Sequence, residues 1–317
     1  MSGPLVRAVG LKKYYKVRGG LLHAVDEVDL EIQPGESLGV VGESGCGKTT
    51  LGRTVLMLTP PTGGKIFFDG VDLTALSRKE RETRRRDMQI IFQDPYSSLN
   101  PRMTIRELIL EPILINKVCP SRPDSEKRVT ALMDTVGLAS RLASSYPHEL
   151  DGGRRQRVGV ARALALESRF IVCDEPVSAL DVSIQAQILN LLMDLQKDMG
   201  LTYLFITHDL SVVRHISNHI MVMYLGRCIE KAPAKELFLR PMHPYTAALL
   251  AAIPVPSLEM RNREIPVIKG EVTSPINPIP ACRFAPRCDR CVGLCHKGEP
   301  KLAKVDEDHF VACFLYD

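Results

Sequence analysis

Residues 38–50 join an apolar run, a glycine-rich turn and the sequence Lys48-Thr49-Thr50. The apolar run, 38–41, predicts a buried strand, and Lys48 is the expected first residue of a helix. Glycines within 42–47 let backbone N–H groups turn toward one point, and the amino end of the helix adds partial positive charge there. We therefore expect this loop to bind the phosphates of a nucleotide.

Each residue of the loop has an expected contact with the nucleotide or its metal. The Lys48 ammonium is expected to pair with the β- and γ-phosphates, and the Thr49 hydroxyl to bind Mg²⁺. ATP and Mg²⁺ are therefore the expected ligands. The predicted nucleotide contacts from this stretch are Gly42, Glu43, Ser44, Gly45, Cys46, Gly47, Lys48, Thr49 and Thr50.

Composition narrows the class of protein. Among 317 residues, 41 Lys and Arg oppose 37 Asp and Glu, and a net charge of +4 is too small to indicate a nucleic-acid partner. No apolar stretch approaches the roughly 20 residues that span a bilayer. Residues 1–10 lack the apolar core of a signal peptide. We expect a cytosolic chain, in which the nine cysteines are not a disulfide framework.

Three further apolar strands end in polar residues. The strand 88–92 precedes Gln93, which can reach a ligand or metal but can equally be a surface residue. The strand 170–173 precedes Asp174 and Glu175. Beside a phosphate-binding loop, Asp174 is expected to hold Mg²⁺ and Glu175 to orient or deprotonate a water. The strand 201–207 precedes His208, which could contact the γ-phosphate or be structural.

The remaining pattern predicts the other elements of the core. We expect strands at 5–10 and 24–32, a strand at 65–70, and a hairpin at 220–225 and 227–230. The loop between the first two strands carries Tyr14 and Tyr15, either of which could stack on adenine or simply pack. Residues 102–167 show helical spacing of apolar side chains, and the last of these helices has Asp151 or Gly152 as its expected N-cap.

Six motifs resemble those of the nucleotide-binding subunit of an ABC transporter, in family order across residues 38–210. They are Gly42–Thr49 (Walker A), Gln93 (Q-loop), Asp151–Gln156 (signature), Cys173–Glu175 (Walker B), Ser178–Asp181 (D-loop) and His208 (H-loop). The resemblance implies an α/β fold of the ABC-type P-loop NTPases. Such a fold has a RecA-like core with an antiparallel β subdomain and a helical subdomain, and it forms an ATP-sandwich dimer.

Other segments resemble the ATP-binding subunits of oligopeptide and dipeptide importers; they are 93–102, 223–227, 240–246, 252–256 and 282–288. The resemblance implies a nucleotide-binding domain at 1–245, with its helical subdomain at about 95–167, and a C-terminal extension at 246–317.

The resemblance also implies roles for individual residues of the nucleotide site. Tyr15 would stack on adenine, with Tyr14 as the alternative; Gln93 would sense Mg²⁺ and the membrane subunit; Glu175 would be the general base; His208 would contact the γ-phosphate.

The signature motif departs from the family pattern Ser-Gly-Gly-Gln, because this chain has Asp151, Gly152, Gly153 and Arg154. Asp caps a helix as well as Ser does, so the exchange is neutral locally. The signature acts on the partner subunit's nucleotide, however, and a carboxylate about 4 Å from a phosphate oxygen would be repelled by up to about 4 kcal/mol at an effective dielectric near 20. Arg154 could offset part of this repulsion. The hypothesis is an asymmetric heterodimer.

Five of the nine cysteines lie near the C-terminus, after a Pro-rich stretch, 254–280, whose composition predicts an extended linker. The resemblance implies a four-cysteine site at Cys282, Cys288, Cys295 and Cys313, with Cys291 as an extra candidate. We expect this small metal-binding extension to hold a [4Fe–4S] cluster, with Zn²⁺ or free thiols as alternatives. The expected role is structural, because so short a tail has too little core to fold alone.

The expected function is that of an ATP-hydrolysing subunit that energises an importer of di- or oligopeptides. The expected partners are a second ATP-binding subunit, two membrane-spanning permease subunits and, indirectly, an extracytoplasmic substrate-binding protein, so the chain would lie at the cytoplasmic face of the membrane. No nucleic-acid partner is expected. The alternatives are a soluble ABC ATPase acting on nucleic acid or ribosomes, an importer of nickel or glutathione, and a metal-sensing regulator with a vestigial P-loop.

Overall fold

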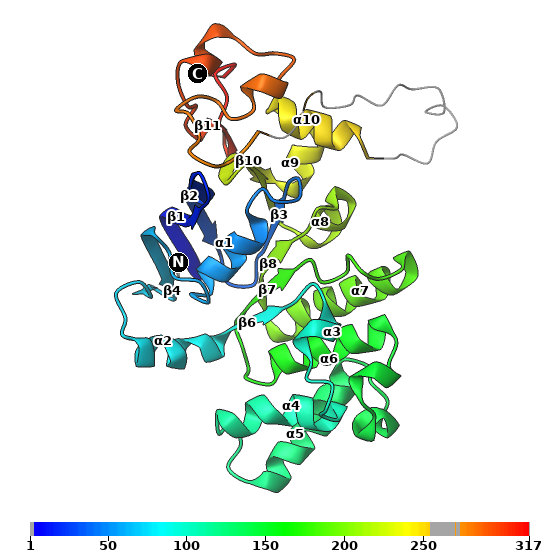
Figure 1. Cartoon of the computed structure of the whole chain (residues 1–317). Helices are drawn as coiled ribbons and strands as arrows, with labels where there is room; N and C mark the ends of the chain where they lie inside the picture. Colours follow the sequence, from blue (N-terminus) through cyan, green and yellow to red (C-terminus); the bar gives the residue numbers. More distant parts are fainter. Residues whose placement is uncertain (1–2, 254–269, 271–272, 317) are drawn as a thin grey trace, which may run out of the picture. The chain divides into compact units, whose positions relative to one another are not determined.

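The computed structural model describes residues 3–253, 270 and 273–316, and in this part of the chain no helix is both long and apolar enough to cross a membrane. The chain divides into two compact units. The first comprises Met1–Ile32, Ser37–Thr74 and Thr207–Asp317, and the second comprises Gln33–Glu36 and Ala75–Ile206 (Figure 1).

An antiparallel sheet in the first unit has the strand order β2-β1-β4-β5. Its strands are β1 (Val6–Val17), β2 (Gly20–Ile32), β4 (Gly63–Phe68) and β5 (Val71–Asp72). The predicted strand at 65–70 is confirmed as β4, apart from its end.

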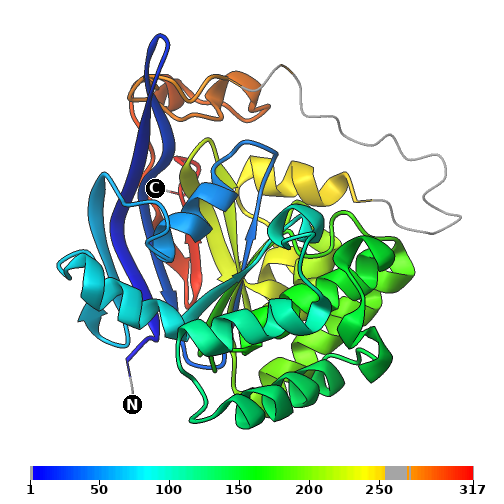
Figure 2. The same ribbon diagram turned by 60° about the horizontal axis from the view of Figure 1, so that its bottom comes forward.

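The predicted loop between β1 and β2 is wrong, because the two strands form one long hairpin (Figure 2). Strand pairing continues through Tyr14 opposite His23 and Tyr15 opposite Leu22. Only a tight turn separates the strands, and its Gly19 and Gly20 have φ angles of 102° and 144°. The outer half of the hairpin has little apolar alternation, so the period-2 pattern that marks a half-buried strand is missing there.

The second sheet segment of the first unit has the order β11-β12-β10-β9-β3. Here β3 (Ser37–Val41) runs parallel to β9 (His219–Tyr224), and the other pairs are antiparallel. The remaining strands are β10 (Arg227–Pro233), β11 (Ala303–Asp306) and β12 (His309–Val311). All five residues of β3 are buried, which confirms the predicted buried strand, and β9 with β10 confirms the predicted hairpin. The helices of this unit are α1 (Lys48–Val55), α8 (Leu210–Ile216), α9 (Ala234–Leu239) and α10 (Pro244–Ala251).

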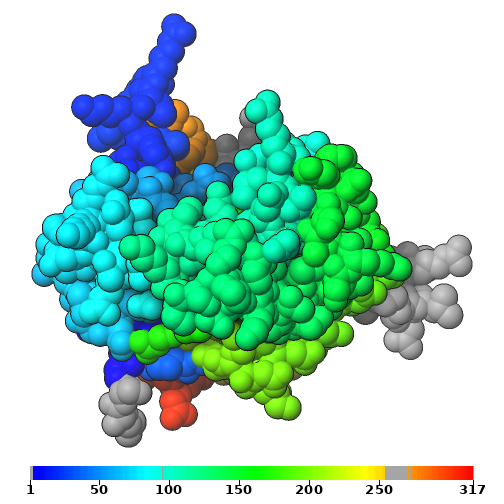
Figure 3. Space-filling model, turned by 90° about the horizontal axis from the view of Figure 1, so that it is seen from below, coloured from blue at the N-terminus to red at the C-terminus, as the bar shows by residue number. Residues whose placement is uncertain are grey.

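The second unit contains a parallel sheet segment and the predicted helices. The strands have the order β8-β7-β6, with β6 at Met88–Ile91, β7 at Phe170–Asp174 and β8 at Thr202–Ile206. The helices are α2 (Arg78–Arg84), α3 (Pro95–Ser98), α4 (Ile105–Ile115), α5 (Arg122–Thr135), α6 (Gly152–Leu164) and α7 (Val182–Met199). The helical segment, in green, makes up much of the face seen in Figure 3. The predicted helical character of 102–167 is thus confirmed.

The C-terminal extension folds onto the first unit. Strand β12 pairs with β10, and the buried carboxylate of Glu230 in β10 accepts hydrogen bonds from the N–H groups of Met242 and His243 and lies 2.7 Å from the His309 ring. Short 3-10 turns at Ala285–Arg287 and Gly293–His296 precede β11. Of the predicted linker at 254–280, only 270 and 273–280 are among the described residues.

Candidate functional site

The phosphate-binding loop connects β3 to α1 in the first unit, as the sequence predicts. Two of its glycines are required by close backbone contacts. A Cβ at Gly47, where φ is 105°, would lie 1.9 Å from the carbonyl oxygen of Ala24, and a Cβ at Gly42 would lie 2.2 Å from that of Met223. Any side chain at either position would therefore displace the loop.

The Lys48 side chain lies across this loop. It is only 5% exposed, and its ammonium donates hydrogen bonds to the carbonyl oxygens of Gly42, at 2.8 Å, and Glu43, at 3.0 Å. Helix α1 begins at Lys48 with Gly47 as its N-cap and no side-chain capping hydrogen bond. The amino end of α1 carries partial positive charge from the aligned peptide dipoles, and an anion can bind there.

Two other residues of the loop, Glu43 and Cys46, have less open surroundings. The Glu43 N–H donates to the Tyr245 hydroxyl at 2.9 Å, and the Glu43 carboxylate pairs with Arg287. The thiol of Cys46 is buried, and burial raises its pKa. Ser44 lies between them, with no interaction that ties it elsewhere in the described part of the chain.

The two tyrosines of β1 differ in their contacts. The Tyr14 hydroxyl donates to Asp26 and the ring stacks on His23 at 4.0 Å, and burial followed by the Asp26 hydrogen bond raises the pKa of Tyr14. Tyr15 has the Lys13 ammonium 4.9 Å from its ring centre. The ring of Tyr14 is therefore already stacked, which favours Tyr15 as the residue that could stack on adenine.

His208 lies close to the strand that enters the phosphate-binding loop. Its neighbour Thr207 donates its backbone N–H to the carbonyl oxygen of Val40 at 3.1 Å, and Val40 is two residues before Gly42. Asp209 is the N-cap of α8, and its carboxylate accepts a hydrogen bond from the Ser211 N–H. The residue before His208 is thus held against β3, the strand that leads into the phosphate-binding loop.

The second unit brings Gln93 and Glu175 together. The side-chain amide of Gln93 donates to the Glu175 carboxylate at 2.9 Å. Glu175 follows the buried Asp174 at the end of β7, has a φ angle of 48°, and donates its N–H to Ile206. A non-glycine residue in the left-handed region is uncommon and is found often at functional sites. The carboxylate is therefore held by both its backbone and Gln93.

The signature residues begin α6. Asp151 is the N-cap, which confirms the first of the two predicted caps, and its carboxylate accepts from the Arg154 N–H at 2.7 Å. The Arg154 guanidinium also pairs with Asp151 at 3.4 Å, with both side chains at least half exposed. A Cβ at Gly153 would lie 2.5 Å from Ile184, so this glycine lets α6 approach α7.

The predicted metal-binding role of the extension is not supported. Within residues 3–253, 270 and 273–316, no three His, Cys, Asp or Glu side chains are grouped to hold a metal ion, neither a [4Fe–4S] cluster nor Zn²⁺. The cysteines Cys282, Cys288, Cys291, Cys295 and Cys313 form no disulfide in the described part of the chain, and burial raises the pKa of Cys282 to about 11. The prediction assumed that the tail must fold alone, whereas β12 and the 3-10 turns pack onto the first unit.

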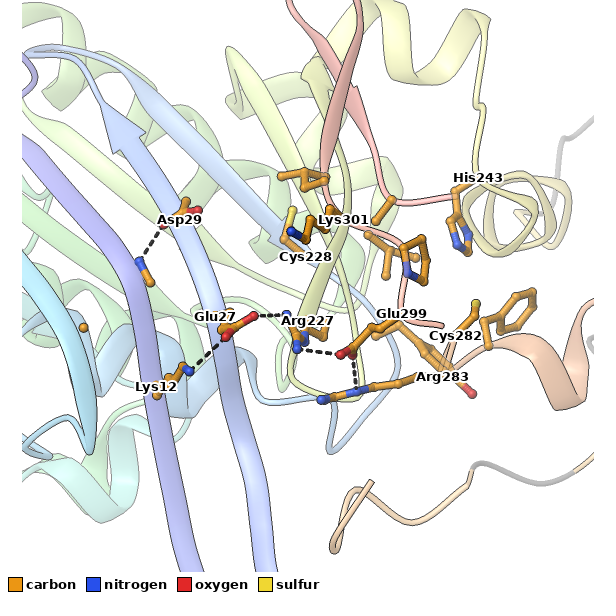
Figure 4. A pocket seen from close by; sticks show the side chains of 18 of the residues that line it. Lys12, Glu27, Asp29, Arg227, Cys228, His243, Cys282, Arg283, Glu299 and Lys301 are labelled. Atoms are coloured by element: carbon orange, nitrogen blue, oxygen red, sulfur yellow. Dashed lines mark hydrogen bonds and ion pairs between the residues drawn. The ribbon is translucent and has the colours of Figure 1, made fainter. Parts of the chain in front are cut away.

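A separate cavity of about 620 Å³ lies in the first unit, between the β1–β2 hairpin and the extension (Figure 4). Its charged lining includes Lys12, Glu27, Arg227, Arg283 and Glu299. None of the predicted nucleotide contacts lines it.

No sequence motif predicts a role for Tyr245, Arg283 or Arg287, which contact the phosphate-binding loop or residues next to it. Their segments, 240–246 and 282–288, were noted only for their resemblance to peptide importers. No local pattern marks these residues, because their partners lie between 58 and 257 positions away in the sequence.

Comparisons with known proteins agree with the geometry. The family model described as ABC transporter matches residues 25–178, and the one described as oligopeptide/dipeptide transporter, C-terminal region, matches residues 229–295. The dipeptide transport ATP-binding protein DppF of Haemophilus influenzae is 47% identical over 320 residues, which cover 99% of this chain and 97% of DppF. YkfD of Bacillus subtilis, named for oligopeptide transport, is 49% identical over 315 residues, which cover 99% of this chain and 96% of YkfD.

Solved structures share the fold. The dimeric ATP-binding cassette MJ0796 bound to ADP and Pi is 30% identical, with a TM-score of 0.67 over 72% of this chain and 98% of that one. The cbiO1 protein of Clostridium perfringens is 28% identical, with a TM-score of 0.67 over 75% of this chain and 92% of that one. These matches confirm the predicted ABC ATPase fold. The chain therefore belongs to the ABC transporter family and, within it, to the oligopeptide/dipeptide transport ATP-binding proteins.

Proposed function

We propose that this chain binds and hydrolyses ATP as the subunit that energises an importer of di- or oligopeptides. The observation that carries the catalytic part is the pairing of Gln93 with Glu175 at the end of β7, together with a phosphate-binding loop closed by Lys48. The peptide substrate is supported by the names of the relatives DppF and YkfD and by the match of the C-terminal region.

In this proposal separate residues bind the nucleotide and catalyse its hydrolysis. Lys48 and the N–H groups of the loop bind the phosphates, Tyr15 stacks on adenine, and His208 contacts the γ-phosphate. Glu175 accepts the proton of the attacking water, and Gln93 keeps its carboxylate in position. The loop residues Gly42, Glu43, Ser44, Gly45, Cys46, Gly47, Thr49 and Thr50 complete the proposed nucleotide contacts.

Thr49, Gln93 and Asp174 are the proposed Mg²⁺ ligands. Their hydroxyl, amide and carboxylate oxygens are the hard donors that this ion prefers. When bound with ATP, Mg²⁺ would neutralise charge on the β- and γ-phosphates.

The proposed partners are a second ATP-binding subunit, two membrane-spanning permease subunits and, indirectly, an extracytoplasmic peptide-binding protein. The chain would then lie at the cytoplasmic face of the membrane. An importer of nickel or glutathione, or a soluble ATPase acting on nucleic acid or ribosomes, has no specific support in the described residues.

Co-expression with the permease subunits tests this function. We expect the chain to sediment with membranes only when the permeases are present, and we expect peptide-loaded binding protein to stimulate ATP turnover of the reconstituted complex. Stimulation by nickel- or glutathione-loaded binding protein, with none by peptide, would contradict the peptide assignment. Turnover that is independent of permeases and rises with added RNA would contradict the transport role.

We also propose that Asp151 and Arg154 make the two nucleotide sites of the dimer unequal. In the free chain Arg154 pairs with Asp151, and both remain exposed at the start of α6. A partner's γ-phosphate would therefore meet a carboxylate in place of a hydroxyl, and part of the repulsion would remain despite Arg154.

The double substitution Asp151→Ser with Arg154→Gln tests this asymmetry. In the heterodimer we expect it to raise ATP turnover about three- to tenfold, because removing a like-charge contact of about 1 kcal/mol changes a rate by about this factor. Arg141→Gln is the matched control, because Arg141 is an exposed arginine of the same unit outside the signature motif. Unchanged turnover together with unchanged nucleotide occupancy at both sites would refute the asymmetry.

A further inference from the structure

The phosphate-binding loop is held from outside by Tyr245, near the start of α10, and by Arg283 and Arg287 of the C-terminal extension. Glu43, its second residue, makes contacts with two of them. Both oxygens of its carboxylate pair with the Arg287 guanidinium, at 2.8 and 3.1 Å, and its N–H donates to the Tyr245 hydroxyl at 2.9 Å. These contacts join Glu43 to residues 202 and 244 positions later in the sequence.

The two anchoring side chains are themselves rigidly placed. Arg287 is 6% exposed as a side chain, and it also donates to the Tyr224 hydroxyl at 3.3 Å. The hydrogen bonds to Glu43 outweigh burial and raise the pKa of Arg287, so its charge is retained. Tyr245 is fully buried, and Tyr224, Tyr245 and Phe284 pack against one another with ring centres 4.8 to 5.3 Å apart. A bidentate pair between such side chains fixes direction as well as distance.

A second set of contacts holds the far side of the same loop. The Arg283 guanidinium donates to the carbonyl oxygen of Leu225 and to the Asp26 carboxylate. Gly226, which follows Leu225, donates its N–H to the carbonyl oxygen of Cys46 in the loop at 2.9 Å. The carbonyl oxygen of Gly226 accepts from the Asp26 N–H, also at 2.9 Å. Figure 4 shows a chain of ion pairs that starts at Arg283. Arg283 pairs with Glu299, Glu299 with Arg227, and Arg227 with Glu27 on β2.

We infer that Tyr245, Arg283 and Arg287 form a C-terminal brace that holds the phosphate-binding loop in the shape that binds nucleotide. The inference rests on the proposed role of this loop in binding ATP. Among the predicted nucleotide contacts, Glu43 is held by two of the brace residues: its N–H donates to Tyr245 and its carboxylate pairs with Arg287. They are positioning residues: they act on nucleotide affinity through the backbone between Gly42 and Gly47.

The brace gives the extension a function that needs no metal. Through the brace, the conformation of the phosphate-binding loop depends on how residues 243–245 and 283–287 pack. By reciprocity, nucleotide bound at the loop must stabilise this packing by the same free energy with which the packing favours binding.

Nucleotide affinity of the purified full-length chain tests the brace, with a fluorescent ATP analogue and Mg²⁺ as the probe. We expect Arg287→Ala to raise the Kd about tenfold, since it leaves the Glu43 carboxylate unpaired and frees the loop. We expect Arg287→Lys, which keeps the charge, and Tyr245→Phe, which removes one hydroxyl, each to raise the Kd about threefold. Arg240→Ala is the matched control, because it removes an exposed Arg pair with Asp306 in the same part of the chain.

Thermal melting separates positioning from general stability. A merely structural role would lower the melting temperature without changing the Kd of the folded fraction, and this result would overturn the brace. An equal rise in Kd for Arg287→Ala and Arg240→Ala would also overturn it. If Arg287→Ala does not fold, the Kd values of Arg287→Lys and Tyr245→Phe decide the question. A wild-type Kd in both variants would refute the brace. Failure of the wild-type chain to bind the probe would instead refute the proposed nucleotide function on which the brace rests.

Discussion

Glu175→Gln is expected to lower ATP turnover by at least about 100-fold while leaving nucleotide binding nearly intact. A positioned general base contributes about 10²- to 10⁴-fold to a rate, and the amide cannot accept the proton of the attacking water. The substitution keeps the size of the side chain and its position at the end of β7, where Gln93 lies 2.9 Å from the carboxylate. Binding depends instead on Lys48 and the loop, which this change does not touch.

Phosphate release in a single turnover, measured on the assembled transporter beside the Kd for the ATP analogue, checks this result. Glu167→Gln is a matched control, because Glu167 belongs to the same unit and also has a positive φ, 57°, but pairs with Arg128 on the surface. We expect the control to turn over ATP at the wild-type rate. A Glu175→Gln variant within a few-fold of wild type would show that another group accepts the proton.

Lys48→Met is expected to raise the Kd for ATP by about 100-fold. Hydrogen bonds to charged groups contribute about 1.5–3 kcal/mol each, and the ammonium is proposed to reach two phosphates. The same change should reduce the free energy of unfolding by about 1–3 kcal/mol, because it leaves the carbonyl oxygens of Gly42 and Glu43 without this donor. Both effects follow from one buried ammonium.

Binding of the fluorescent ATP analogue and urea unfolding measure the two effects separately. Lys65→Met provides the control, since Lys65 is exposed on β4 in the same unit and lies 3.9 Å from Asp72. We expect this variant to match wild type in both measurements. Wild-type affinity in Lys48→Met would exclude the proposed phosphate contact, whatever its stability.

Local chemistry made much of the nucleotide site predictable. A strand, a glycine-rich loop and Lys48 must follow one another directly, so a short stretch of sequence is enough to predict the phosphate-binding loop. The ends of β6 and β7 were also predictable, because β6 is a short run that ends two residues before Gln93 and β7 is a buried apolar run that ends at Asp174. Asp151 was predictable as an N-cap because the cap depends on its own side chain and the turn that follows.

Features that depend on distant partners were missed or wrong. The outer half of the β1–β2 hairpin has no apolar pattern, and the pairing of Tyr14 with His23 shows only in the structure. The cysteine-rich extension was expected to need a metal because its own core is small. In the structure it packs against β10 and the Tyr224 ring, so its stability comes from the rest of the first unit.

The sequence by itself thus determined the nucleotide chemistry, because each of those motifs acts through neighbours in the chain. Only the tertiary structure decided that Arg287 and Tyr245 hold Glu43, that Gln93 meets Glu175, and that Tyr14 is occupied by Asp26 and His23. The physical reason is that an ion pair or hydrogen bond between residues far apart in sequence leaves no periodic or local pattern. It exists only after strand pairing and core packing have brought its two partners within about 3 Å.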